Sequence, residues 1–245
     1  TVVLTTIYRQ QKDLPFIDFL NHIRLGEITE KVDAFARSLE RPRPHYRNSD
    51  TIQHTQLCCY KKNVVTNNTH YLRQLDHRTL HSYKVCFGSG TTSKTKTAIL
   101  KTLPIPEILH LKLYTQVMVP FNVDVDQKLA NGTKGVIIGF HGPTNFPIVK
   151  FQHVTRIIRP VKWFVRPRVY VLCIPLIVAY STTIHKSQGA SIDYLHVNLR
   201  GAFAQHQVYV ALSRATTSTH LSIEGWDPTA VQVSEKVKQF YISSS

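Results

Sequence analysis

The sequence predicts an α/β fold in which a parallel-sheet domain is interrupted by a small all-β barrel. From residue 173 onward, apolar strand-like segments alternate with helical ones, as is typical of a parallel sheet covered by helices. Between residues 108 and 172, short strands follow one another closely, which is typical of a small barrel. We therefore assign residues 1–107 and 173–245 to one discontinuous domain and residues 108–172 to its insert.

The first forty residues carry mainly helix signals, after a β-branched segment at residues 1–7 that predicts a strand. Asp13 can cap a helix with an apolar stripe, and Gly26 can end it. Thr29 can cap a second helix, which Pro42 stops. These signals predict two consecutive helices.

The middle of the chain is predicted to be mainly β. A strand at residues 55–60 and a helix at residues 63–75 come first, and the Ser-, Thr- and Lys-rich residues 88–97 predict a mobile loop. The Asn131-Gly132 pair signals a hairpin. Three further strands are expected at residues 148–151, 155–158 and 163–165.

The C-terminal part supplies the strand and helix alternation. Its expected elements are a buried strand at 174–180, a strand at 195–199, a helix at 205–212, a strand at 220–223 and a last helix. Asp227 and Pro228 mark the start of that helix, as cap and first-turn proline. The helix is expected to bury Ala230, Val233, Val237 and Phe240.

Composition indicates a polyanionic partner. Thirty Lys and Arg residues against fifteen Asp and Glu give a net charge of +15, which favours nucleic acid. The four cysteines form no C-x-x-C pair, so we expect no metal site and a reduced intracellular compartment. No apolar run is long enough for a membrane span. The chain starts at Thr1 and its one methionine is Met118, so we expect a fragment of a longer protein.

The residues TIHKSQG, 183–189, form the first candidate site. They follow a predicted buried strand, where open α/β sheets bind ligands. Thr183 can cap a short helix and leave amide donors for phosphate, and Gly189 allows close backbone approach. An ordinary polar loop with a capping threonine is the alternative.

Two arginines are candidate phosphate ligands. Arg214 ends an apolar helix in the segment VYVALSRA, 208–215, and Arg9 follows the first strand in YRQ, 8–10. An arginine held in such a place can reach a γ-phosphate across an interface. Taken singly, Arg214 can instead be a helix-end residue favoured by the helix dipole, and Arg9 a surface residue.

Taken together, these three motifs resemble those of the Pif (petite integration frequency) family. Its members are superfamily-one DNA helicases that travel 5′ to 3′. Further matches, in family order over nearly the whole chain, are FLNHIRLG at 19–26, QVM at 116–118, NGTKGV at 131–136 and WDP at 226–228. The resemblance implies a second RecA-like domain with an inserted Src-homology-three-like barrel.

The resemblance also implies roles for single residues. Arg9 and Arg214 would contact the γ-phosphate of ATP from across an inter-domain cleft. The residues near the nucleotide would be Gln10, Gln188 and Gly189. The DNA-binding residues would be Thr183, His185, Lys186, Ser187, Asn131 and Lys134. The implied DNA partners are single strands and junctions.

The part of a helicase that would bind ATP is not recognisable in this sequence. The residues GSGTTSKT at 88–95 approach a phosphate loop, but Ser93 stands where a glycine is needed. No Asp-Glu pair follows a later strand to hold Mg²⁺. ATP and Mg²⁺ would therefore be bound mainly by an absent N-terminal motor domain, which becomes an expected partner.

Two other functions fit parts of the sequence. One is a DNA-binding module without catalysis, such as a decayed helicase remnant. The other is a self-sufficient phosphate-loop enzyme built on residues 88–95. A helicase would work inside the cell, in the nucleus or the mitochondrion if the source is a eukaryote.

Overall fold

The computed structural model describes residues 8–10, 12–43, 49–88, 91–124, 126, 129–166 and 169–244. The chain divides into two compact units. The first comprises Thr1–His45, His54–Asn67 and Ser181–Ser245, and the second comprises Tyr46–Gln53 and Asn68–Tyr180. These bounds differ from the predicted boundaries near residues 107 and 172. The strand predicted at residues 1–7 lies outside the described residues.

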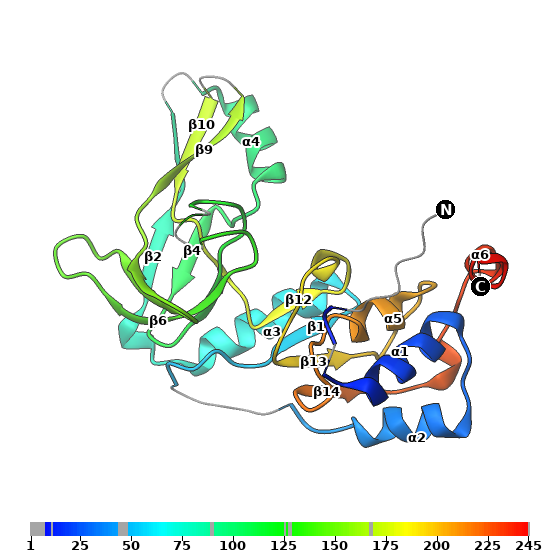
Figure 1. Cartoon of the computed structure of the whole chain (residues 1–245). Coiled ribbons are helices and arrows are strands. Elements are labelled where there is room, and N and C mark those ends of the chain that lie inside the picture. The colour runs from blue at the N-terminus through cyan, green and yellow to red at the C-terminus, as the bar shows by residue number, and fades with distance from the viewer. Residues whose placement is uncertain are drawn as a thin grey trace. The chain divides into compact units, whose positions relative to one another are not determined.

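A four-stranded parallel sheet forms the centre of the first unit (Figure 1). Its strands are β1 (Thr55–Cys58), β12 (Ser181–Thr183), β13 (Leu195–Asn198) and β14 (Leu221–Glu224). They are ordered β12-β1-β13-β14, and every pair is parallel. The prediction of an α/β fold with a parallel sheet is therefore confirmed.

The helices α1 (Leu14–Leu25), α2 (Glu30–Ser38) and α5 (Gln207–Leu212) belong to the same unit. The Asp13 carboxylate accepts a hydrogen bond from the Phe16 amide, and Gly26 ends α1 with a φ of +74°. The Thr29 hydroxyl accepts one from the Val32 amide at the start of α2. The predicted caps are confirmed because each depends only on residues within one turn.

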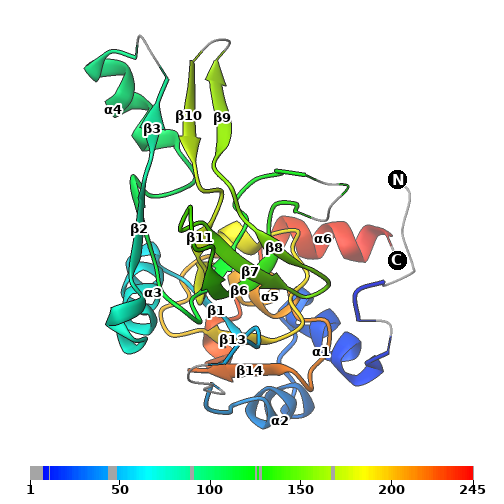
Figure 2. The same ribbon diagram turned by 90° about the vertical axis from the view of Figure 1, so that its left-hand side faces the viewer.

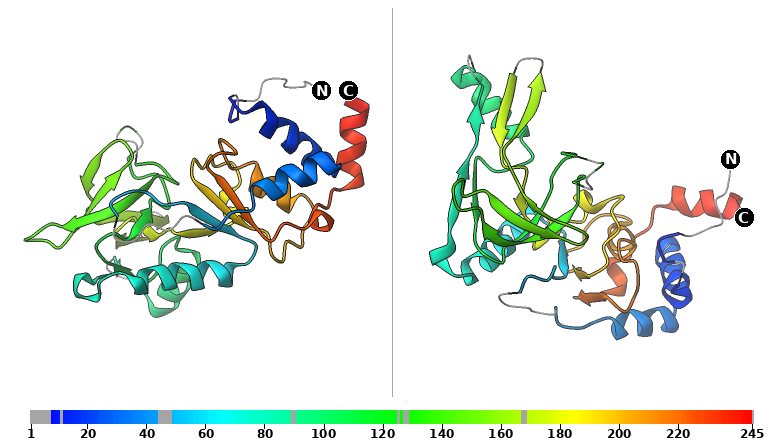
Figure 3. Two further views of the ribbon diagram at one scale, coloured as in Figure 1. Left: turned by 90° about the horizontal axis from the view of Figure 1, so that it is seen from below. Right: turned by 60° about the vertical axis from the view of Figure 1, so that its left-hand side comes forward.

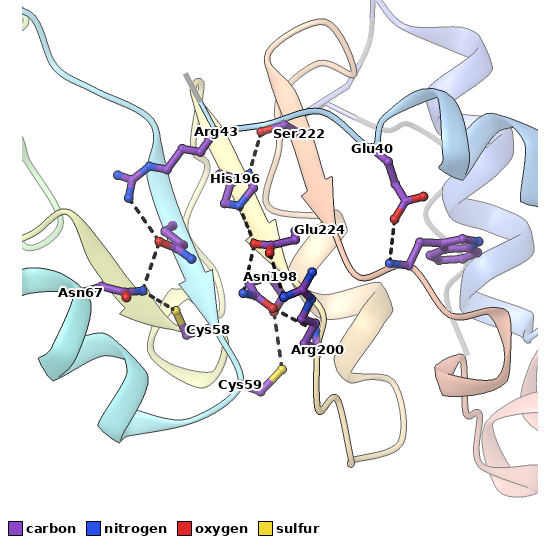
Figure 4. Close-up of polar contacts among 12 residues, drawn as sticks. Glu40, Arg43, Cys58, Cys59, Asn67, His196, Asn198, Arg200, Ser222 and Glu224 are labelled. Atoms are coloured by element: carbon purple, nitrogen blue, oxygen red, sulfur yellow. Dashed lines mark hydrogen bonds and ion pairs between the residues drawn. The ribbon is translucent and has the colours of Figure 1, made fainter. Parts of the chain in front are cut away.

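One face of the sheet is apolar and the other is polar. Side chains alternate along a strand, so Leu57, Val197 and Ile223 share a face and join the core with residues of α1, α2 and α5. The opposite face carries Gln56, Cys58, His196, Asn198, Ser222 and Glu224 (Figure 4). Parallel sheets are usually apolar on both faces.

The second unit contains three smaller sheets. The five-stranded sheet has β11 (Ile177–Val178), β5 (Gln116–Met118), β6 (Lys134–Phe140), β7 (Pro147–Phe151) and β8 (Thr155–Ile157), in that order. The three-stranded sheet has β3 (Cys86–Phe87), β10 (Val169–Cys173) and β9 (Val161–Arg166). The third sheet pairs β2 (His81–Lys84) with β4 (Ile108–Leu111).

The β-rich nature of this unit agrees with the sequence, but a closed barrel is not confirmed. The predicted hairpin is present, because β5 pairs antiparallel with β6. The strand predicted at residues 163–165 lies within β9 and pairs with β10 in a separate sheet. Figures 2 and 3 show the β9–β10 ribbon projecting from the rest of this unit.

The middle of the chain also contains the helices α3 (Lys61–Gln74) and α4 (Ser93–Thr102) and a 3₁₀ turn. The helix α4 corrects the predicted mobile loop at 88–97, since Thr92 caps it and Ile99 is buried. A 3₁₀ turn, η1 (His77–Thr79), follows α3. No helix in the described part of the chain is long and apolar enough to cross a membrane.

The strand predicted at residues 174–180 is wrong. The chain there leaves β10, pairs briefly as β11 with β5, and enters the parallel sheet only at β12. Pro175 lacks an amide donor and cannot continue a central strand. Apolar residues of this run, such as Ile174 and Leu176, are buried in the core of the second unit.

The last predicted helix is also corrected. Asp227 caps only a 3₁₀ turn, η3 (Pro228–Ala230), and the helix α6 (Glu235–Ser244) begins separately. Phe240 is 52% exposed rather than buried. The aspartate and proline signal specifies how a helical turn starts but not how far it continues.

Candidate functional site

Arg9 connects three segments of the first unit. Its Nη1 donates to the Ser213 carbonyl oxygen at 2.9 Å, and its Nε donates to the Ser191 hydroxyl at 2.8 Å. Its Nη2 donates to the Gly189 carbonyl oxygen at 3.4 Å. The segment N-terminal to α1 is thereby attached, through Arg9, to the loop after β12 and to the end of α5.

Arg214 lies beside the same point. It follows α5, and its Nε donates to the Val210 carbonyl oxygen at 2.8 Å. Its Nη2 donates to the Ser213 hydroxyl, also at 2.8 Å. The residue is only 8% exposed. Arg9 and Arg214 therefore converge on Ser213 from opposite ends of the chain.

The two guanidinium groups form a site of positive charge. Burial, and then the charge of Arg9, lower the pKa of Arg214. No ion pair among the described residues involves either arginine. Neighbouring cations without a carboxylate are electrostatically unfavourable unless an anion binds them, so this arrangement is suited to a phosphate.

Gln10 stabilises the backbone on both sides of Arg214. It is buried, and its Nε2 donates to the carbonyl oxygens of Ser213 at 3.2 Å and Ala215 at 2.7 Å. Ile192 pairs with Ala215 as an isolated parallel bridge, and its amide donates to the Arg214 carbonyl. The predicted nucleotide-binding role of Gln10 stays a prediction.

The loop after β12 extends from the sheet edge to Arg9. The Thr183 hydroxyl accepts from the Lys186 amide at 3.3 Å, at the start of the 3₁₀ turn η2 (His185–Ser187). Ser187 is buried and donates to the Ile184 carbonyl oxygen, so its hydroxyl is used within the loop.

Three other residues of this loop face solvent. His185, Lys186 and Gln188 are exposed, and Gly189 has a φ of +86°. These side chains are accessible to a ligand, whereas Gly189 provides the turn that brings its carbonyl to Arg9.

Asn131 and Lys134 belong to the second unit, at the connection that enters β6. Asn131 is exposed, and its amide donates to the Asn122 side-chain oxygen at 2.9 Å. Lys134 is half-buried and pairs with Met118 in the β5–β6 ladder. Their predicted contact with DNA remains untested.

The segment at 88–95 shows no sign of a phosphate loop in its described part. The Thr91 hydroxyl donates to the Gly88 carbonyl oxygen, and Ser93 opens α4. Ser89 and Gly90 lie outside the described residues. The described residues also contain no group of three or more His, Cys, Asp or Glu side chains able to hold a metal ion.

The sequence did not indicate the backbone carbonyl that holds Arg9 and Gln10, nor the hydrogen bonds on the polar face of the sheet. The Ser213 carbonyl is the common acceptor for Arg9 and Gln10, and a backbone atom has no sequence signal. On the polar sheet face, His196 bonds Ser222 at 2.9 Å and Asn198 donates to Glu224 at 3.2 Å (Figure 4). The alternation of these polar residues with Leu195 and Val197 was a usable signal.

Known proteins similar to this chain are helicases. No protein-family profile matches it. The ATP-dependent DNA helicase PIF1 of Xenopus laevis is 37% identical over 247 residues, which cover 98% of this chain and 38% of that protein. The Pif1 helicase of Bdellovibrio bacteriovorus is 31% identical, covering 98% of this chain and 54% of its own length.

The solved structures that are similar to this chain are also helicases. The crystal structure of Pif1 helicase from Candida albicans matches with a TM-score of 0.82 and 29% identity, covering 98% of this chain and 60% of that one. Bacteroides Pif1 bound to single-stranded DNA shares the fold, with a TM-score of 0.70 at 22% identity.

The fold and these matches show that the chain is similar to one part of longer helicases with an α/β fold. More specifically, it is similar to Pif1 helicases along nearly its whole length. The chain spans about two fifths of the length of its vertebrate relatives.

Proposed function

We propose that the chain is the C-terminal part of an ATP-dependent DNA helicase that moves 5′ to 3′ on single-stranded DNA and unwinds duplexes. One observation carries this proposal: Arg9 and Arg214, two cations without a carboxylate partner in the described part of the chain, converge on Ser213. The names of its relatives as ATP-dependent DNA helicases support the same activity.

The arginines act as fingers toward the γ-phosphate of ATP. Guanidinium groups match phosphate oxygens in charge and geometry, and an arginine finger contributes about 10³–10⁵ in rate. Gln188 and Gly189 lie in the loop that Arg9 contacts and sense the nucleotide, whereas Gln10 supports the backbone of Ser213 and Ala215. Hydrolysis of bound ATP would supply the free energy for stepping along DNA.

The described residues contain no group of three or more His, Cys, Asp or Glu side chains that could hold a metal ion, and no described ion pair brings a carboxylate to Arg9 or Arg214. We assign the metal and most of the triphosphate to an N-terminal motor domain, which this proposal requires as a partner. A complex of Bacteroides Pif1 with ADP-AlF4 supports nucleotide use by proteins of this fold.

The DNA contact is assigned to the loop after β12. Thr183, His185 and Lys186 stand at its start, and Gly189 at its end bonds Arg9. One short loop thus carries both the DNA contacts and the contact with Arg9. A change in the bound nucleotide would therefore alter how this loop contacts DNA. Ser187 shapes this loop through its bond to Ile184, and Asn131 and Lys134 contact the strand or a junction from the second unit.

Unwinding by a longer polypeptide that carries this chain after a phosphate-loop domain tests the proposal. The substrates are duplexes with a single-stranded 5′ tail or a 3′ tail, with ATP or without it. The 5′-tailed duplex is expected to be unwound only with ATP. Unwinding of neither substrate, or of the 3′-tailed one alone, contradicts the proposal.

A DNA-binding module without catalysis is the second candidate. The bonds of Arg214 to Val210 and Ser213 favour it, because they already satisfy two nitrogens of the guanidinium group. ATP-independent binding to DNA, with no turnover by the longer polypeptide, would identify this alternative. In either case the work on DNA is intracellular, with a nuclear or mitochondrial address for a eukaryotic protein.

A further inference from the structure

Two aromatic rings stand together at the carboxyl edge of the parallel sheet. Tyr60 follows β1 and Phe203 follows β13, and these strands are neighbours. The rings are stacked, with centroids 5.4 Å apart and planes inclined by 19°. Tyr60 is 40% exposed and Phe203 is 57% exposed. This stacked and open pair is not explained by the core or by the arginine site.

Neighbouring residues fix the positions of both rings. Gly201 has a φ of +77°, and a Cβ there would lie 3.0 Å from Cε2 of Tyr60, so the ring lies against its backbone. The amides of Phe203 and Ala204 donate to Oε1 of the buried Gln207 at 2.9 and 3.2 Å. The loop bearing Phe203 is therefore ordered before a ligand arrives, which lowers the entropy cost of binding.

Lysines lie near the rings in the sequence and on the same sheet edge. Lys61 and Lys62 directly follow Tyr60 and are exposed, and no ion pair of the described residues involves them. Lys186 lies on the same sheet edge, because the last residue of β12 is in register with the last residue of β1. Aromatic faces beside cations are the two elements that bind single-stranded nucleic acid.

We propose that Tyr60 and Phe203 form a stacking platform for an unpaired base of single-stranded DNA. Lys61 and Lys62 contact the adjoining phosphates. The platform extends the DNA contact from the loop after β12 along the sheet edge to β13. It rests on the proposed function, and it adds a contact to the base beside the contacts to the backbone.

Binding of the 245-residue chain to two labelled strands tests the platform. One is a thymidine strand with a central 2-aminopurine, and the other has the same length but contains only abasic sites. Both are titrated at several salt concentrations. The wild-type chain is expected to bind the base-bearing strand about 5- to 100-fold more tightly and to quench 2-aminopurine.

Variants identify the rings responsible. Phe203→Ala and Tyr60→Ala are expected to lose most of the preference for bases while binding the abasic strand as before. Phe164→Ala is the matched control, because Phe164 is 61% exposed in the second unit. The quenching measurement needs no variant, so unquenched 2-aminopurine overturns the platform even if an alanine variant fails to fold.

The results separate the two proposals. Equal binding of both strands by the wild type, unquenched 2-aminopurine at saturation, or a preference retained in both ring variants would overturn the platform. In each of these cases, salt-dependent binding leaves the helicase proposal intact. Failure of the wild type to bind either strand would contradict both.

Discussion

Arg9 donates a 2.9 Å hydrogen bond to the carbonyl oxygen of Ser213, the residue that directly precedes Arg214. This bond joins two residues that are more than two hundred positions apart in the sequence. It places a second cation beside a buried arginine, and burial together with that charge lowers the pKa of Arg214. A bound anion would relieve this repulsion, so the two arginines are suited to binding one anion together.

Gln10 supports this arrangement, so its loss is expected to destabilise the fold. In Gln10→Ala, the Ala215 carbonyl loses its 2.7 Å bond within a buried environment. An unsatisfied buried group costs about 1–3 kcal/mol, and urea denaturation measures the change in the free energy of unfolding. Gln205→Ala, at an exposed position, is the control and is expected to have little effect. Equal stability of the Gln10 variant and wild type would contradict the assignment.

Gly189 is required for its backbone conformation rather than for lack of space. Its φ is +86°, and a Cβ added there would meet no atom within 4 Å beyond the adjoining residues. Gly189→Ala is therefore expected to cost about 1–2 kcal/mol, and Gly189→Asn less, because asparagine tolerates the left-handed region. Thermal or urea unfolding checks this order. A larger loss for asparagine than for alanine would show that space is limiting.

Gly135 provides the opposite case. A Cβ at Gly135 would lie 2.6 Å from Cγ1 of Val149 and 2.8 Å from the Lys150 carbonyl oxygen. Gly135→Ala is expected to destabilise the second unit through this clash, by about 1–3 kcal/mol. The same unfolding measurements apply, and wild-type stability of this variant would show that the β6–β7 pair adjusts without cost.

His54 is expected to make stability depend on pH. Burial, followed by the charge of Arg43, lowers the pKa of His54 from 6.5 to about 4. Between these values the unfolded chain binds a proton that the folded chain excludes, so stability falls as the pH drops from about 6.5 to 4. His54→Gln removes this contribution and flattens the profile over that range.

The free energy of unfolding, measured from pH 7 to pH 4, checks the histidine prediction. Burial also lowers the pKa of His196, so part of the slope is expected to remain in the His54 variant. His153→Gln, at an exposed position, is the control. A slope in His54→Gln as steep as that of wild type would contradict the prediction.

Lys186 is expected to contact a phosphate of DNA. Removing one such contact lowers the slope of log K against log salt by about 1, and it weakens binding equally for all sequences. Lys186→Ala should show this change in titrations with single-stranded DNA. Lys31→Ala is the control, since Lys31 is exposed and pairs with Asp18. An unchanged slope for Lys186→Ala would remove this residue from the DNA contact.

Local signals in the sequence were the reliable ones. Asp13, Gly26 and Thr29 each act within one helical turn, and all three caps are present. The parallel sheet followed from alternating elements at residues 173–245, since each strand there is short and apolar on one face. Thr92 was an equally local cap, but the Ser, Thr and Lys content around it masked the start of α4.

Features that depend on distant partners were not predictable. Residues 174–180 are apolar throughout, and only the tertiary structure decides that β11 pairs with β5 while β12 pairs with β1. The motif residues Arg9 and Arg214 were identified, but their meeting at Ser213, Arg9 at its carbonyl and Arg214 at its hydroxyl, depends on the packing of α5 against α1. The pairing of Tyr60 with Phe203 likewise needs two neighbouring strands.

ATP turnover by the longer polypeptide tests the central claim most directly. We predict that Arg9→Ala and Arg214→Ala each lower kcat at least about 100-fold while the Kd for single-stranded DNA stays unchanged, since both guanidinium groups act on the phosphate. Arg37→Ala, which removes an exposed arginine paired with Asp33, should leave both values at the wild-type level. Wild-type kcat in the Arg214 variant would contradict the account.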